Sequence, residues 1–171
     1  MSLHKRHTAE SLFACFEELE ILYKNHMHPP VFTVEESKQL RGTLHGAHTK
    51  NLFLRDKKKR FWLLTVSESQ SVDLKTLKRY LGASGSLSFG SAEYLENYLG
   101  VLPGCVTPYS VINDATGTVT MLLDSELLKT DPINAHPLQN DMTVAVSPSD
   151  LLRFLEEQGH TPHMIDFAEL T

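Results

Sequence analysis

The segment GVLPGCVTPYS, residues 100–110, has the composition of a loop that can bind an oxyanion. It places two glycines and two prolines between a predicted helix and a predicted strand. Glycine lets backbone N–H groups approach a bound group where a Cβ would block them, and Pro108 fixes the exit of the loop. A rigid loop with exposed N–H groups suits an oxyanion or a carbonyl oxygen. An ordinary turn is an equally good interpretation of these residues.

The segment HPLQN, residues 136–140, is a second candidate. His136 and Asn140 offer polar groups on either side of a bend stiffened by proline. The alternative interpretation is a turn held by its own hydrogen bonds.

A third candidate is the segment HTKNLFLRDKKKR, residues 48–60, which contains two kinds of cation. Lys50 lies directly before the apolar run 52–54, so a strand would hold it in place. Five cations follow within residues 55–60, a pattern typical of a solvated turn or, at most, of a surface that steers a nucleic acid. These residues alone leave three interpretations open: Lys50 is the functional cation, the cluster is functional, or neither is.

Several other kinds of site are excluded or disfavoured. The sequence contains no G-x-S-x-G, no G-x-x-x-x-G-K-[ST] and no G-x-G-x-x-G motif, which disfavours an α/β-hydrolase nucleophile and the usual nucleotide-binding loops. The nine histidines include His45-x-x-His48 and His160-x-x-His163, but neither pair has a nearby thiolate pair or an obvious third ligand. We therefore predict no metal and interpret these histidines as surface and loop residues.

Composition limits the class of protein. The hydrophobic fraction of 41% and charged fraction of 22% are those of a globular protein. No apolar run approaches the ~20 residues that cross a bilayer, and no signal-peptide pattern is present, so we expect no membrane association. Cys15 and Cys105 are too few for a disulfide framework, which predicts a cytoplasmic location. The net charge of −5 disfavours coating of nucleic acid and leaves room for a grip on one end of an RNA.

The elements that must position these residues alternate along the chain. Apolar spacing and capping residues predict helices, and β-branched runs bounded by turns predict strands. The 171 residues are long enough for one domain with a buried core, and we predict a single mixed α/β domain over 1–171. The predicted helices are 8–25, 73–82, 91–100 and 147–159; the predicted strands are 31–34, 51–54, 61–66, 111–112, 119–123 and 142–146, with hairpins at 55–59 and 113–117.

Several segments in this order and spacing resemble one known family. They are FTVEE (32–36), HTKNLFLRDKK (48–58), LSFGSAEYLENYLGVLPGCVTPYSVIND (87–114) and HPLQN (136–140). The chain is similar to the free-standing prolyl-tRNA editing family, the YbaK/ProX-type aminoacyl-tRNA deacylases, which are related to the insertion domain of bacterial prolyl-tRNA synthetases. It looks closest to the branch that removes alanine from tRNA-Pro.

The resemblance implies a fold and a set of roles. The implied fold is an α/β domain with a curved mixed sheet surrounded by helices, without a cofactor. The implied catalytic residues are Lys50 and Gly104. Two positions depart from the pattern we expect of the family, Cys105 in place of a small residue such as serine and Asp141 in place of threonine. The implied substrate-binding residues are Phe32, Thr33, Asn51, Pro108, Ser110, His136 and Asn140.

The resemblance also implies a reaction. An aminoacyl-tRNA is an activated ester, so its hydrolysis needs a positioned water and stabilisation of the oxyanion rather than a protein nucleophile. The implied partners are the acceptor end of aminoacylated tRNA-Pro and a prolyl-tRNA synthetase. Two alternatives stay open: a Cys-tRNA-Pro deacylase, and a module that binds aminoacylated RNA or a synthetase without hydrolysis.

Overall fold

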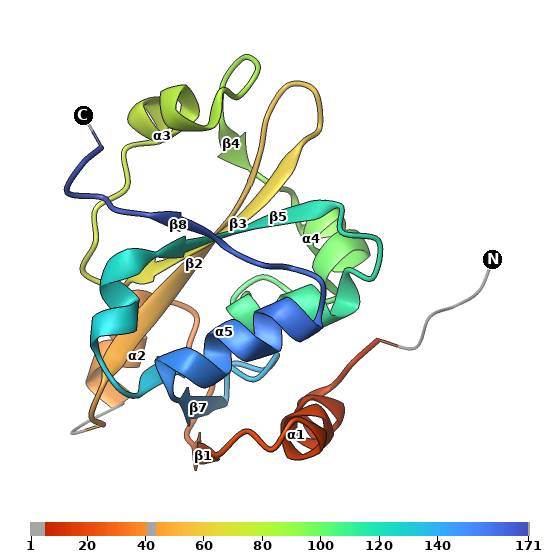
Figure 1. The fold of residues 1–171 in the computed structure, drawn as a ribbon, viewed down its shortest axis with the longest axis vertical. Helices are drawn as coiled ribbons and strands as arrows, with labels where there is room; N and C mark the ends of the chain where they lie inside the picture. Colours follow the sequence, from red (N-terminus) through yellow and green to blue (C-terminus); the bar gives the residue numbers. More distant parts are fainter. Residues whose placement is uncertain (1–5, 41–43, 171) are drawn as a thin grey trace.

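A mixed sheet of eight strands forms the centre of the structure, a computed structural model that describes residues 6–40 and 44–170 (Figure 1). The strand order is β1-β7-β6-β2-β3-β5-β8, and β4 pairs with β2. The predicted α/β fold with helices around a mixed sheet is confirmed. The strands are β1 (Tyr23–Met27), β2 (Ala47–Arg55), β3 (Phe61–Ser67), β4 (Ser88–Phe89), β5 (Val119–Asp124), β6 (Ile133–Ala135), β7 (Met142–Val146) and β8 (His163–Ile165).

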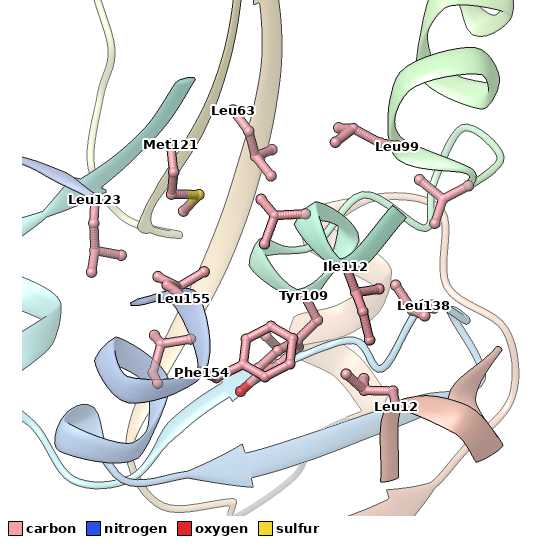
Figure 2. Packing of buried hydrophobic residues seen from close by; sticks show 14 of the residues in the cluster. Leu12, Leu63, Leu99, Tyr109, Ile112, Met121, Leu123, Leu138, Phe154 and Leu155 are labelled. Carbon is pink, nitrogen blue, oxygen red and sulfur yellow. The ribbon is translucent and has the colours of Figure 1, made fainter. Parts of the chain in front are cut away.

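Helices cover both faces of this sheet. Residues of β3 alternate between two hydrophobic clusters, with Leu63 in the larger and Leu64 in the smaller. The larger cluster includes residues of α1, α4, α5 and η1 and has Tyr109 packed edge-on against Phe154 (Figure 2). The smaller cluster packs under α3. The helices are α1 (Ala9–Glu18), α2 (Val34–Leu40), α3 (Leu74–Leu81), α4 (Ala92–Leu99) and α5 (Pro148–Glu157), with 3-10 turns η1 (Pro108–Asn113) and η2 (Ser125–Lys129).

Local capping explains why three of the predicted helices are confirmed. The side chain of Asp73 accepts a hydrogen bond from the N–H of Lys75, and α3 ends at Gly82 in the left-handed region, with φ of 63°. Ser91 caps α4 and Ser147 caps α5 in the same way. These side-chain oxygens satisfy backbone donors that the first turn of a helix leaves unpaired.

Three local predictions are wrong, two of them because distant strands decide the structure and one because a local cap starts a helix. The predicted helix 8–25 ends at Glu18, and Tyr23 begins β1, which pairs with β7 from the other end of the chain. Residues 31–34 form no strand, since the Thr33 hydroxyl accepts the N–H of Glu36 at the start of α2. Residues 111–112 lie in η1 rather than in a hairpin, because β5 pairs in parallel with β3.

Strand β2 has an open stretch along one edge. It pairs with β3 over residues 49–55, and the N–H of Glu68 donates to the carbonyl of His48 (2.9 Å). In an antiparallel ladder these bonds alternate, so the backbone groups of Asn51 face the opposite edge. Among the described residues, that edge is paired only toward its ends: 47–48 pair with β6, 54–55 pair with β4, and the carbonyl of Phe53 accepts the N–H of Gly90. The sheet is therefore open between these two contacts.

A buried ion pair joins the end of α5 to the loop before β5. His160 Nε2 lies 2.9 Å from Asp114 Oδ2, and Nδ1 lies 2.9 Å from the carbonyl of Gln158. Both partners only accept, so His160 carries both ring protons. The hydrogen bond to Asp114 raises the pKa of His160 despite burial. Burial alone would raise the pKa of Asp114, but the bonds from His160 and Val119 outweigh it and lower that pKa.

We expect His160→Ala to lower the free energy of unfolding by about 3–5 kcal/mol, because it leaves the Asp114 carboxylate buried without its cation. Because the pKa of His160 is raised in the folded state, the pair contributes its full stability below about pH 6.5. This contribution is lost as the pH rises through the folded-state pKa. Urea unfolding at pH 6 and pH 9 measures it, with exposed His163→Ala as the matched control. Equal losses for both variants at pH 6 would contradict the prediction.

Candidate active site

A cleft of about 250 Å³ lies at the open edge of β2. It brings together residues from five separate segments: the stretch that leads into α2, β2, the turn after β3, the 100–108 loop and the turn after β6. Six of the nine residues implied by the sequence line it, namely Phe32, Thr33, Lys50, Asn51, Gly104 and His136.

Lys50 and Asn51 enter the cleft from β2. Lys50 is partly buried, and within the described residues its ammonium group forms no ion pair or hydrogen bond. Asn51 is oriented by the hydroxyl of Thr65, which donates to Asn51 Oδ1 (2.6 Å). This bond leaves the Nδ2 group of Asn51 as a donor for a bound oxygen. The site thus presents one cation and one oriented amide donor.

The stretch before α2 forms one wall of the cleft. The carboxylate of Glu36 accepts the N–H of Phe32 (2.7 Å), and Thr33 caps the helix. This is a variant of the capping box, which is why T-V-E-E starts a helix here. The Phe32 ring stays 68% exposed and lies against Gly104. An exposed aromatic ring at the rim of a cleft can stack on a planar group such as a base.

The glycine loop contributes two backbone donors. Gly104 has φ of 88°, and a Cβ there would lie 3.2 Å from the Phe32 ring. The N–H of Cys105 donates to the carbonyl of Leu102 (3.0 Å). Within the described part of the chain, the N–H groups of Gly104 and Val106 make no such bond, and both residues line the cleft. The N–H groups of Gly104 and Val106, on either side of Cys105, are therefore available to donate to an oxygen that gains negative charge.

His136 provides an acceptor. Its Nδ1 lies 2.8 Å from the carbonyl of Met142, so Nδ1 carries the proton and Nε2 holds a lone pair. Burial lowers the pKa of His136, and the nearby His28 lowers it further, although the bond to Met142 opposes both. The ring is therefore neutral at pH 7.

The other three implied residues lie behind the cleft instead of lining it. Pro108 and Ser110 are buried in η1, where the Ser110 hydroxyl accepts the N–H of Thr107 (3.2 Å). The Asn140 amide donates to the carbonyl of Val31 (2.8 Å), and its backbone N–H bonds the thiol of Cys105. In this structure these residues hold the glycine loop and the Phe32 wall in position.

Residues 28–154 match the family model described as the aminoacyl-tRNA editing domain. The chain belongs to this family. This editing-domain chain is 44% identical over 142 residues to prolyl-tRNA synthetase associated domain-containing protein 1 of Danio rerio, covering 82% of this chain and 77% of that one. It is 36% identical over 153 residues to prolyl-tRNA editing protein ProX of Acetoanaerobium sticklandii, covering 89% and 93%.

The fold of the editing domain also matches a solved structure. A crystal structure described as a candidate trans-editing enzyme for prolyl-tRNA synthetase superposes with a TM-score of 0.69, covering 95% of this chain and 98% of that one. Its sequence identity is 21%, so this match is evidence for the fold alone.

Sequence reasoning missed some residues of the editing-domain cleft. Thr49, Glu68 and Val106 also line it. Val106 lies inside the predicted loop and Thr49 beside Lys50, so both were within reach of the motifs. Glu68 follows β3 in a polar stretch, and no local sequence pattern marks it as a site residue. It is placed at the cleft by the β2–β3 register, which brings it opposite His48.

The histidine pairs have other roles in the described residues. His48 Nε2 bonds the carbonyl of Leu44, and His160 pairs with Asp114. Across residues 6–40 and 44–170, no three His, Cys, Asp or Glu side chains form a metal-binding group. The same residues include no helix with the length and hydropathy to span a bilayer.

Proposed function

We propose that this chain is a trans-editing hydrolase that deacylates mischarged tRNA-Pro, with Ala-tRNA-Pro as its main substrate. The observation that carries the proposal is the convergence of Lys50, Gly104 and His136 at the open edge of β2 in a chain of the editing family. The name of the ProX relative, a prolyl-tRNA editing protein, supports tRNA-Pro as the RNA.

In the proposed mechanism, water attacks the carbonyl carbon of the aminoacyl ester directly. The bond from that carbon to the ribose oxygen then breaks, a proton from the water passes to the ribose oxygen, and the free amino acid is released. The N–H groups of Gly104 and Val106 bind the carbonyl oxygen as it gains negative charge, and Lys50 holds that oxygen or the terminal phosphate. The free hydroxyl of the terminal ribose helps to activate the water. His136 Nε2 accepts a hydrogen bond from the α-ammonium group of the substrate.

Cys105 is not the nucleophile in this mechanism. Burial raises the pKa of its thiol, and the charge of Asp141 raises it further, although a bond from the N–H of Asn140 opposes both. A thiol with a raised pKa carries little thiolate at pH 7, and the thiolate is the reactive form.

Substrate choice follows from size. A synthetase pocket built for proline discriminates against a smaller side chain only ~10–200-fold per missing methylene, and a second small site can correct the error. We expect this cleft to admit alanine and exclude the pyrrolidine ring. The tRNA itself must then distinguish Ala-tRNA-Pro from Ala-tRNA-Ala, because the ester is identical in both.

The test is a comparison of single-turnover rates on four substrates: Ala-tRNA-Pro, Pro-tRNA-Pro, Ala-tRNA-Ala and Cys-tRNA-Pro. We expect Ala-tRNA-Pro to be cleaved fastest. Faster cleavage of the cysteinyl ester would assign the chain to the Cys-tRNA-Pro alternative. Cleavage of none of them would favour a binding module.

The lowered pKa of His136 predicts the pH dependence of the reaction. Below that pKa the ring becomes an imidazolium, which repels the substrate ammonium and has no lone pair to accept from it. We expect the deacylation rate, divided by that of His136→Gln at each pH, to stay level from pH 8 to 6.5 and fall at lower pH. A fall already centred above pH 6.5 would contradict the assignment. An NMR titration of His136 gives the pKa independently.

A further inference from the structure

The turn between β2 and β3 is built as a rigid basic loop. The buried carboxylate of Asp56 accepts the N–H groups of Lys58, Arg60 and Ser84 and the guanidinium of Arg60. Burial alone would raise the pKa of Asp56, but these bonds outweigh it and lower the pKa to about 2. The carboxylate therefore stays charged and holds the turn in one conformation.

The same turn is fixed to the loop that follows α3. The N–H of Lys57 donates to the carbonyl of Ser84 (2.9 Å), and Arg60 donates to the carbonyl of Gly82 (2.9 Å). A Cβ on Gly85 would lie 2.9 Å from the Cβ of Lys57, so the two segments are in close contact. The turn and α3 thus form one surface at the end of the sheet away from α2 (Figure 1).

Six cations lie on the turn and on α3, and we call the surface that they form the distal basic surface. On α3, Lys75, Lys78 and Arg79 follow i, i+3, i+4 spacing on the side opposite Leu77, and they line a groove of about 550 Å³. Within the described residues none of the six forms an ion pair. This concentration stands out in a chain with a net charge of −5. The members are Lys57, Lys58, Lys59, Lys75, Lys78 and Arg79.

The distance between the distal basic surface and the cleft matches the distance from the end of an RNA strand to its double-helical stem. Strand β2 is extended from Lys50 to Arg55 and the turn reaches Lys57 two residues later, so the two lysines are separated by up to about 23 Å at ~3.3 Å per residue. That length corresponds to roughly seven stacked nucleotides at ~3.4 Å each. A strand whose last nucleotide sits in the cleft would therefore have its double-helical stem, not its single-stranded end, at the distal basic surface.

Two exposed aromatic side chains lie on α3 and on β4, the strand that pairs with the end of β2. Phe89, opposite Leu54 in the β4–β2 pairing, is 61% exposed, and Tyr80 on α3 is 53% exposed. Exposed rings near clustered cations are typical of surfaces that bind nucleic acids, but the bases of a double-helical stem stack on one another, so the cations make the contact here through the phosphates.

We propose that the distal basic surface binds the phosphate backbone of the acceptor stem while the aminoacylated end of the same RNA occupies the cleft. This proposal rests on the proposed function, since it assumes that an RNA end enters the cleft. It assigns the turn and α3 a role in RNA affinity, separate from the chemistry at Lys50. Phosphate contacts of this kind give affinity that falls steeply with salt.

The test measures binding of uncharged RNA by fluorescence anisotropy at several salt concentrations. One probe is a hairpin with the acceptor stem of tRNA-Pro and its single-stranded 3′ end; the other is that 3′ end alone, as a tetranucleotide. The test variant carries four substitutions, Lys57→Gln, Lys58→Gln, Lys75→Gln and Lys78→Gln. Lys59 and Arg79 are kept, so the turn and α3 lose two cations each.

Two double variants that lose the same charge at different places separate the effect of position from the effect of net charge. Lys58→Gln/Lys78→Gln removes two cations from the surface, and Lys24→Gln/Lys129→Gln removes two exposed cations elsewhere. We expect the quadruple variant to bind the hairpin about tenfold or more weakly and to lower the slope of log K against log salt by about 3, with about half that slope change for the first pair. We expect the Lys24/Lys129 pair and all tetranucleotide affinities to stay unchanged.

Three outcomes would overturn the proposal. One is equal hairpin affinity and salt slope for the unaltered chain and the quadruple variant. Another is an equal loss on the tetranucleotide, which would place the cations beside the single-stranded end. The third is binding of phosphatidylserine vesicles, but not of the hairpin, through these cations. Surface-dependent hairpin binding by a chain that cleaves no aminoacyl ester would instead support the surface and contradict the proposed function.

Discussion

We expect Lys50→Ala to deacylate Ala-tRNA-Pro about 10²–10³-fold more slowly than the unaltered chain, because loss of one well-placed electrostatic contact to an oxyanion costs about that much. The fold should persist, since within the described residues the Lys50 ammonium has no partner that its removal would leave unpaired. Single-turnover rates at saturating enzyme, together with the thermal midpoint of unfolding, measure both expectations.

Two controls define what the lysine does. Lys24→Ala removes an exposed lysine from β1 and should leave the rate unchanged. Lys50→Arg keeps the charge but replaces a compact ammonium with a planar guanidinium, so we expect only partial activity. A folded Lys50→Ala variant with full activity would remove Lys50 from the mechanism.

Gly104→Ala should cause a comparable loss of rate, about 10²-fold, by displacing the loop that carries the N–H donors of Gly104 and Val106. The φ of 88° at Gly104 is unfavourable for alanine, at a cost of about 1–2 kcal/mol. The new methyl group would also lie 3.2 Å from the Phe32 ring, so the ring or the loop must shift by a few tenths of an ångström.

Gly117→Ala is the matched control for this substitution. Gly117 also has a positive φ, 68°, but a Cβ there would meet no atom within 4 Å, and the residue lies in the loop before β5, outside the cleft. We expect both variants to lose similar stability and only Gly104→Ala to lose most of its activity. Equal deacylation rates for the two variants would mean that the glycine loop does not stabilise the oxyanion.

Local patterns in the amino-acid sequence predict the elements whose stabilising contacts lie within a few residues. Asp73 with Gly82, and Ser91 with Gly100, mark the two ends of α3 and α4, because a cap bonds to N–H groups two or three positions away. The β2–β3 hairpin also follows from local apolar runs and a polar turn. The motifs around Lys50, Gly104 and His136 likewise pointed to segments that meet in one cleft.

Other features depend on pairing between distant segments and follow only from the folded structure. Tyr23 is in a strand because β7 offers it a partner at Val146, which overrides the helical spacing of residues 8–25. The open edge of β2 exists because β6 and β4 pair with its two ends, a property of no single segment. The same packing buries Ser110 behind the cleft and brings Glu68 into it. Such contacts depend on which strands meet, and a pattern read along one stretch of chain contains no information about its distant partner.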